Sequence, residues 1–370
     1  MSAAVLGTIV GLGVLSPARL KVLLAHHDAV DALERLRSGD LLHPMVSRGL
    51  PAGRLDALRA AARVASVDQM ADALDRCGVG VHGLHDASYP AALVHDPEAP
   101  AALFVRGDLG ALESRRVGII GTRHASAAGR ATASELGSVL AGEGVAVVSG
   151  LARGIDAAAH RGVRARGGPG RPIAVVGSGP DRHYPKQNAE LWEWVAAEGA
   201  LISEWPPGVE PDAWRFPQRN RILAALSEVV VVVESRERGG SLITARLAAD
   251  RGIEVMAVPG SPRSRASLGT NQLLVDGVAP VTSAADVLMM LGLDHRREGS
   301  VPFDPRPQPD EVQRAVLAVC EGEPSNLDMI VSATGFVVMD AALAAARLER
   351  EGWLIEAGGW FEPTGSRLCP

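Results

Sequence analysis

Three nearly continuous apolar runs in the middle of the chain each end at small polar residues, after which a helix-like pattern begins. The runs are Val117–Ile120, Val145–Val148 and Val229–Val233. Runs of this kind are typical of strands buried on both faces of a parallel sheet. Ligands bind such sheets at the carboxyl ends of the strands, where helix N-termini point backbone N–H groups outward. We therefore expect the three strand ends to form a surface suited to phosphate.

The first run leads into Gly121, Thr122 and Arg123. Glycine permits close backbone approach, while the threonine hydroxyl and the arginine guanidinium both suit phosphate. An ordinary strand-to-helix turn with a solvated arginine would have the same sequence, so this segment alone leaves both interpretations open.

The second run leads into a loop that contains Ser149, Gly150 and Arg153. The loop lacks the G-x-G-x-x-G spacing of dinucleotide sites, and the chain has no P-loop motif. This predicts a polynucleotide backbone or a free phosphate as ligand. Asp156 and His160, spaced i,i+4, are candidate metal ligands, but no third ligand is evident. Capping and packing are therefore the favoured roles, and we expect neither metal nor cofactor.

Arg219, Asn220 and Arg221 form the densest polar cluster of the region. Pro217 suits a helix start, which would put both arginines in the first turn, where cations oppose the helix macrodipole. We interpret this placement as a sign of a bound anion. The alternative is pairing with a carboxylate, either Glu204 or Glu234.

The third run leads into Gly240, Ser241 and Thr244, which offer amides and two hydroxyls at another helix N-terminus. Such an arrangement binds phosphate. Tyr184, in a separate loop, is a candidate for stacking on a base, and a structural turn is the equal alternative. Lys186 is the only lysine of the region, because nearly all basic residues are arginine.

The charge distribution favours a polyanionic ligand despite a net charge of −6 over 370 residues. Residues 308–370 hold ten acidic residues and four arginines, which account for the whole −6. Residues 115–171 hold nine arginines and three acidic residues, a local +6. A basic patch on an acidic protein is the feature that matters for polyanion binding.

The sequence predicts a cytoplasmic protein without a membrane partner. No basic and apolar N-terminal signal is present, and no apolar stretch approaches membrane-spanning length. The three cysteines, which form neither a disulfide framework nor a metal-spaced cluster, are Cys77, Cys320 and Cys369.

The sequence patterns predict three domains and one linker. Residues 1–78 form a helical module, SAM-like or helix-hairpin-helix-like, with helices predicted at 18–24, 29–37, 54–64 and 67–74. The turn at Gly11–Gly13 is either a DNA-contacting hairpin or part of a small packing module.

Residues 79–293 alternate strand and helix, the pattern of an α/β fold with an extended Rossmann-like open sheet. Further strands are predicted near 103–106, 173–177, 200–202, 253–257 and 279–281. Helices are predicted near 126–142, 155–166, 187–198, 219–226, 242–251 and 284–291.

Residues 294–309 read as a Pro-rich linker. Residues 310–370 predict a winged helix, with helices at 310–320, 327–333 and 338–350 and a terminal hairpin. The acidity of this domain favours a protein partner or a structural role over duplex binding.

Catalytic motifs are lacking: there is no Cys/His pair with an orienting partner, no G-x-S-x-G elbow and no metalloprotease helix. We therefore expect a protein that is not an enzyme.

An ordered series of motifs resembles the DNA processing protein A (DprA/Smf) family over roughly residues 85–290. The motifs are G-T-R at 121–123, S-G-L-A-R-G-I-D-A-A-A-H at 149–160, Y-P-K-Q-N at 184–188, I-S-E at 202–204, F-P-Q-R-N-R at 216–221, G-G-S-L-I-T-A at 239–245 and V-P-G at 258–260.

The resemblance implies a non-catalytic recombination mediator that binds and protects single-stranded DNA. It further implies help in loading RecA during natural transformation, and a homodimer formed through the Rossmann-like domain. By motif, the DNA phosphates would lie against Gly121, Arg123, Ser149, Gly150, Arg219, Asn220, Arg221, Gly240, Ser241 and Thr244, with Thr122, Arg153 and Lys186 as added candidates.

Two other functions remain as alternatives. Phosphoribohydrolases that cleave nucleoside monophosphates share a similar fold and use a glutamate in P-G-G-x-G-T-x-x-E. Here the glutamate position falls on Arg246 or Leu247, depending on the alignment, and neither is acidic. A transcription regulator acting through the winged helix is disfavoured by the acidity of that domain.

Overall fold

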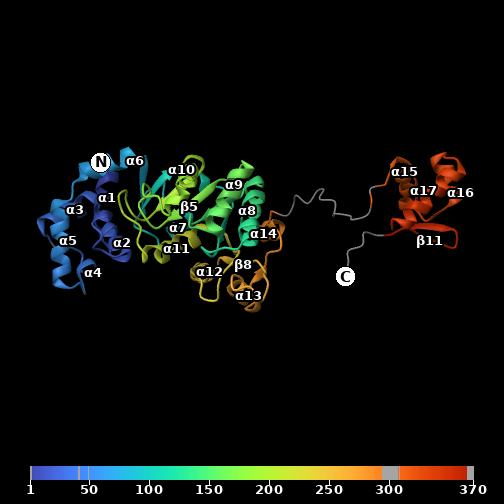
Figure 1. Ribbon diagram of the computed structural model, residues 1–370. Coiled ribbons are helices and arrows are strands. Elements are labelled where there is room, and N and C mark those ends of the chain that lie inside the picture. The colour runs from blue at the N-terminus through green and yellow to red at the C-terminus, as the bar shows by residue number, and fades with distance from the viewer. Residues whose placement is uncertain (1, 41, 49, 294–306, 308, 365–370) are drawn as a thin grey trace. The chain divides into compact units, whose positions relative to one another are not determined.

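The computed structural model describes residues 2–40, 42–48, 50–293, 307 and 309–364 (Figure 1). The chain divides into two compact units, Met1–His295 and Arg296–Pro370. The predicted linker at 294–309 lies almost entirely outside the described residues.

The N-terminal helices form a module whose core continues into the first strands of the sheet. Ala4 and Leu74 share a buried cluster with Val79 and Phe104. The four predicted helices are confirmed, and two more are present. The helices are α1 (Ser2–Gly11), α2 (Pro17–His26), α3 (Ala29–Ser38), α4 (Pro44–Ser47), α5 (Ala52–Val64) and α6 (Val67–Cys77).

A large sheet forms the centre of the first unit. In the described residues its strand order is β1-β2-β6-β5-β4-β3-β7-β8-β9. The strands from β6 to β9 in this order are parallel, and β1 and β2 are antiparallel. The strands are β1 (Val79–Gly83), β2 (Ala102–Gly107), β3 (Arg116–Ile120), β4 (Ala146–Ser149), β5 (Pro172–Val176), β6 (Ala200–Ser203), β7 (Val229–Val232), β8 (Glu254–Ala257) and β9 (Ala279–Pro280).

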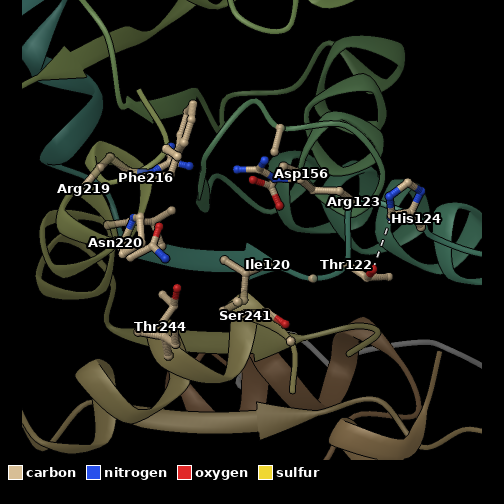
Figure 2. A pocket seen from close by; sticks show the side chains of 18 of the residues that line it. Ile120, Thr122, Arg123, His124, Asp156, Phe216, Arg219, Asn220, Ser241 and Thr244 are labelled. Atoms are coloured by element: carbon tan, nitrogen blue, oxygen red, sulfur yellow. Dashed lines mark hydrogen bonds between the residues drawn. The ribbon is translucent and has the colours of Figure 1, made fainter. Parts of the chain in front are cut away.

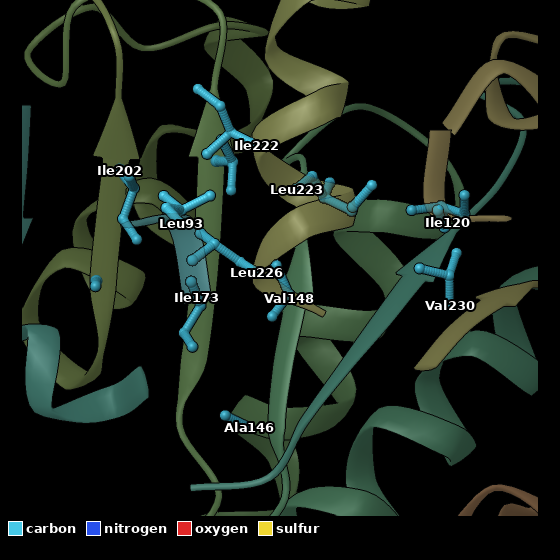
Figure 3. Close-up of a cluster of buried hydrophobic side chains, with 14 of the residues drawn as sticks. Leu93, Ile120, Ala146, Val148, Ile173, Ile202, Ile222, Leu223, Leu226 and Val230 are labelled. Atoms are coloured by element: carbon cyan, nitrogen blue, oxygen red, sulfur yellow. The ribbon is translucent and has the colours of Figure 1, made fainter. Parts of the chain in front are cut away.

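Alternating side chains of the apolar runs are buried on opposite faces of the sheet, as strands covered on both sides require. Val230 and Val232 pack with Leu223 and Leu226 of α11 on one face (Figure 3). Val231 belongs to the cluster on the other face, with α8, α9 and α14. The helices are α7 (Ala91–Val94), α8 (Ala127–Gly142), α9 (Ile155–Arg166), α10 (Ala189–Glu198), α11 (Arg215–Leu226), α12 (Gly240–Ala249), α13 (Leu268–Val275) and α14 (Ala284–Met290), with 3-10 turns η1 (Leu109–Leu112) and η2 (Lys186–Asn188).

The second unit contains the predicted series of three helices and a hairpin. Its core includes Leu317, Ile330 and Leu348, one from each helix. The small sheet has the order β10-β12-β11. The elements are α15 (Glu311–Gly322), β10 (Ser325–Asn326), α16 (Leu327–Thr334), α17 (Val338–Arg350), β11 (Leu354–Ala357) and β12 (Trp360–Pro363).

No single helix in the described part of the chain has the length and apolarity needed to cross a membrane. The helices α16 and α17 meet those criteria only when taken together, and they are bent by 115° at their break.

Candidate functional site

A pocket lies where the strand order of the sheet reverses direction. From β3 the chain proceeds to β4, β5 and β6 on one side, and β7 then pairs with the other side of β3. The loops after β3 and β7 therefore diverge, which leaves a crevice of the kind that binds ligands in open α/β sheets. The crevice, here called the main pocket, has a volume of 540 Å³ and is also lined by α11 and the start of α12 (Figure 2).

The loop after β3 is held by backbone hydrogen bonds to both neighbouring loops. The amide of Thr122 donates to the carbonyl oxygen of Glu234 at 2.8 Å, and the amide of Ile155 donates to the carbonyl oxygen of Thr122 at 3.3 Å. A Cβ at Gly121 would lie 2.8 Å from the Ile155 Cβ and 2.9 Å from the Glu234 carbonyl oxygen. Glycine is therefore required where these loops cross.

The carboxylate of Glu234 belongs to the scaffold of the main pocket. It accepts hydrogen bonds from the amide of Ser126, at 2.9 Å, and from the hydroxyl of the same serine. Ser126 is the N-cap of α8, so Glu234 fixes the start of that helix to the end of β7. The predicted alternative, in which Glu234 pairs with an arginine of α11, is not observed in the described residues.

Arg219 places a buried positive charge at the wall of the main pocket. The residue is 4% exposed, and its Nη1 donates to the carbonyl oxygen of Gly150 at 3.0 Å. Burial lowers the pKa of Arg219 to about 10, against the opposing effect of the Asp156 carboxylate. Burial raises the pKa of Asp156, while Arg219 and backbone amides lower it. The two groups therefore compensate each other's charge in a site of low solvent access.

Three side chains stack at one edge of the main pocket. The guanidinium of Arg123 lies 4.9 Å from the centre of the Phe216 ring. The rings of Tyr184 and Phe216 are 5.3 Å apart, with an angle of 30° between their planes. Tyr184 is 41% exposed. The stack joins a cation to an exposed aromatic face, the combination with which proteins bind successive nucleotides of a single strand.

The start of α12 supplies the opposite side of the main pocket. Gly239 is the N-cap and makes no side-chain capping bond, and Ser241 and Thr244 lie on the first turns (Figure 2). The hydroxyl of Ser241 is 2.9 Å from that of Ser235. A helix start with small residues and little side-chain capping leaves its amides available to an anion.

The main pocket has an excess of positive charge. Among the described residues its lining includes four arginines and two aspartates, a balance of +2. Arg236 and Arg238 are exposed on the loop after β7 and are not among the predicted site residues. Their closeness in the sequence to Gly240, a predicted site residue, could have identified them as site residues. The charged residues are Arg123, Arg219, Arg236, Arg238, Asp156 and Asp212.

The sequence model of the family described as DNA recombination-mediator protein A matches residues 81–292. The chain belongs to this family. Protein Smf of Synechocystis sp. is 34% identical over 310 residues, which cover 74% of this chain and 77% of that protein.

Two solved structures of the family share the fold. The X-ray structure of DNA processing protein A from Streptococcus pneumoniae has a TM-score of 0.66 and 31% identity, and the match covers 76% of this chain and 95% of that one. A structure of DNA processing protein A from Helicobacter pylori, which addresses its single-stranded DNA binding mode, has a TM-score of 0.52 and 27% identity. That match covers 58% of this chain and 99% of the other.

Most of the predicted site residues lie together. Those that line the main pocket are Gly121, Thr122, Arg123, Arg219, Asn220, Gly240, Ser241 and Thr244. Gly150 and Arg153 line an adjoining pocket of 220 Å³, here called the side pocket, which shares Arg123, Tyr184 and Phe216 with the main pocket.

Three predicted site residues lie outside both linings. Ser149 is fully buried, and its hydroxyl donates to the carbonyl oxygen of Ile119 at 2.6 Å, which ties β4 to β3. Lys186 is exposed on η2. Arg221 is buried in an ion pair with Glu204, with 2.6 Å between Nη2 and Oε1. The predicted alternative of carboxylate pairing is thus confirmed for Arg221.

The predicted start of α11 at Pro217 was wrong, because the helix begins at Arg215. The arginines at 219 and 221 consequently lie in the second turn, where the macrodipole opposes a cation less strongly. The helix position of these arginines therefore does not indicate a bound anion.

The predicted packing role of His160 agrees with its surroundings. The side chain is fully buried, and its Nε2 lies 3.3 Å from the carbonyl oxygens of both Val147 and Ile173. Burial lowers its pKa to about 4, so the ring is neutral near pH 7. No group of three or more His, Cys, Asp or Glu side chains in the described residues is arranged to hold a metal ion.

Proposed function

We propose that this protein binds single-stranded DNA in the main pocket and acts as a recombination mediator without catalysing a reaction. The observation that supports this most strongly is the convergence of Arg123, Arg219 and the start of α12 beside the Tyr184–Phe216 stack. Cations and helix amides suit the phosphates, and the aromatic stack suits the bases. The single-stranded DNA binding of the Helicobacter pylori relative supports the same ligand.

Each part of the main pocket has a proposed role. Arg123 is exposed at the mouth and would contact a phosphate directly, with the hydroxyl of Thr122 and the amides of Gly240 and Ser241 around it. Arg219 is fixed by the Gly150 carbonyl oxygen before DNA arrives, so little side-chain entropy would be lost on binding. The side pocket, beyond the stack, would accept the next nucleotide on that side.

The hydrolase alternative has less support. The sequence places Arg246 or Leu247 where the phosphoribohydrolases have their catalytic glutamate, and both lie on α12. Asp156 lines the main pocket, but the positive charge of Arg219 acts on its carboxylate and lowers its pKa. We therefore propose a binding function.

Further properties follow from the family as proposals. We further propose that the protein helps to load RecA, is cytoplasmic, has a winged helix as its second unit and forms a homodimer through its first unit. For the homodimer, exposed apolar side chains on α13 and α14 offer a candidate surface, namely Val275, Met289 and Met290.

Fluorescence anisotropy with labelled oligo-dT and a matched duplex tests the proposed function. We expect salt-sensitive binding that favours the single strand and needs neither ATP nor Mg²⁺. Equal or tighter binding of the duplex would contradict the proposal. Incubation with nucleoside monophosphates tests the alternative, since release of free base that depends on the main pocket would establish a hydrolase.

A further inference from the structure

A third cavity lies beside the main pocket, at the contact between the N-terminal module and the sheet domain. This cavity, here called the α2 pocket, has a volume of 480 Å³. Pro217 and Ile243 line both it and the main pocket, so the two are adjacent. Its other walls come from the start of α2, from residues 97–99 and from later residues of α11 and α12.

The lining of the α2 pocket is mainly apolar. Pro17 and Ala18 of α2 contribute to it, together with Pro97, Ala99 and Leu247. Lys21 donates from Nζ to the carbonyl oxygen of Pro97 at 3.0 Å, which fixes α2 against the loop that closes the cavity. Proline rings and small aliphatic side chains form walls suited to a planar, weakly polar group.

Five polar or charged side chains also line the α2 pocket, namely Ser16, Lys21, Glu98, Gln218 and Arg221. Arg221 is buried and its Nη2 is paired with Glu204, whereas Gln218 is exposed and presents its side-chain amide at the pocket. Ser16 is the N-cap of α2, yet its hydroxyl makes no capping bond. An amide carries two donors and an acceptor, so Gln218 can pair with the polar edge of a ring.

We propose that the α2 pocket holds a nucleobase of the same single strand whose phosphates occupy the main pocket. This inference rests on the proposed function. The shared wall at Pro217 and Ile243 lets one strand reach both cavities. The apolar walls suit the base faces, and the side-chain amide of Gln218 pairs with a ring nitrogen or carbonyl oxygen at the base edge. The N-terminal module thereby becomes part of the DNA site through Ser16 and Ala18.

A bulky substitution in the full-length protein tests this assignment. Ala18→Trp fills the α2 pocket from an exposed position, whereas Ala25→Trp makes the same change near the other end of α2 as a control. The probe is oligo-dT of about a dozen nucleotides, with one abasic nucleotide placed at each position in turn. In the wild type, we expect abasic positions to weaken binding wherever a base is held.

One of these positions should become insensitive in Ala18→Trp and stay sensitive in Ala25→Trp. The Ala18→Trp variant should also bind intact oligo-dT about fivefold or more weakly, because a base contact of this kind contributes at least that much. Its salt dependence should equal that of the wild type, since no phosphate contact is lost. Gln218→Ala, which changes the same pocket without adding bulk, should reduce sensitivity at the same position.

Wild-type affinity and an unchanged abasic pattern in both Ala18→Trp and Gln218→Ala would overturn the inference while leaving the proposed function intact. Failure of the wild type to bind oligo-dT would instead reject the proposed function, and this inference with it.

Discussion

At the scale of single residues, Gly150 and Arg219 determine how charge is presented in the site. The carbonyl oxygen of Gly150 accepts from Arg219, and the absence of a side chain at Gly150 makes room for the guanidinium. A Cβ there would lie 2.6 Å from Arg219 Nη1 and 2.6 Å from Asp156 Oδ2. The close approach of backbone, cation and carboxylate is thus possible only with glycine at this position.

Gly150→Ala should therefore weaken single-stranded DNA binding by about tenfold, as expected when a charged hydrogen-bonding group is displaced. Anisotropy titrations measure the effect. Gly53→Ala is the matched control, because a Cβ there meets nothing within 4 Å. Unchanged affinity in Gly150→Ala would show that the position of Arg219 does not matter for binding.

The sequence could predict the role of a residue where that role depends only on the loop that contains it. Arg123 and Ser241 could be selected because they follow apolar runs at strand ends. Ser149 follows such a run as well, but its hydroxyl is turned to the neighbouring strand, which only the sheet register reveals. Phe216 stacks on Tyr184, which is distant in the sequence, so no local sequence pattern could predict this contact.

At the scale of elements, α9 is joined to the sheet by the neutral ring of His160. Its pKa is about 4 in the folded protein, below the ordinary value of 6.5. Between these values the unfolded chain takes up a proton that the folded chain does not. The free energy of unfolding should therefore decrease as the pH falls from about 6.5 to 4, by up to about 3 kcal/mol, and this term should change little below pH 4.

Urea unfolding of the wild type and of His160→Gln across this pH range measures the contribution. The difference in the free energy of unfolding between the two proteins should shrink as the pH falls, because only the wild type loses the histidine term. The buried carboxylates of Asp156 and Glu204 are common to both proteins and cancel in the difference. A difference that is constant with pH would contradict the neutral, buried state of His160.

Elements with a long, regular pattern were predictable, and short or irregular ones were not. The apolar runs that form β3, β4 and β7 are buried on both faces, so their sequences are almost continuously apolar. Strand β1 was missed because its sequence, VGVHG, is short and contains two glycines. Helix α13 was also missed, since its sequence combines glycine, threonine and asparagine with leucine.

At the scale of the whole molecule, the acidic charge is concentrated in one part of the sequence and the candidate site is built from another. The net charge is −6 in total and −6 in residues 308–370, which leaves 0 for residues 1–307. All the pocket residues belong to the first compact unit.

A chain that ends at residue 293 should accordingly retain single-stranded DNA binding. At salt below about 0.1 M it should bind more tightly than the full chain, because the Debye length then exceeds about 10 Å and the acidic unit repels the phosphates. The two affinities should converge as salt is added. Loss of binding in the truncated protein, at any salt concentration, would show that the second unit contributes to the DNA site.

The dependence of oligo-dT affinity on salt, measured for the wild type, Arg123→Ala and Arg164→Ala, tests the central claim most directly. Both variants lose one exposed positive charge, but only Arg123 lines the main pocket. If Arg123 contacts a phosphate, the slope of log K against log salt should become shallower by about 0.7 in Arg123→Ala and stay unchanged in Arg164→Ala. Identical slopes in all three proteins, or an equal change in both variants, would contradict a phosphate-binding main pocket.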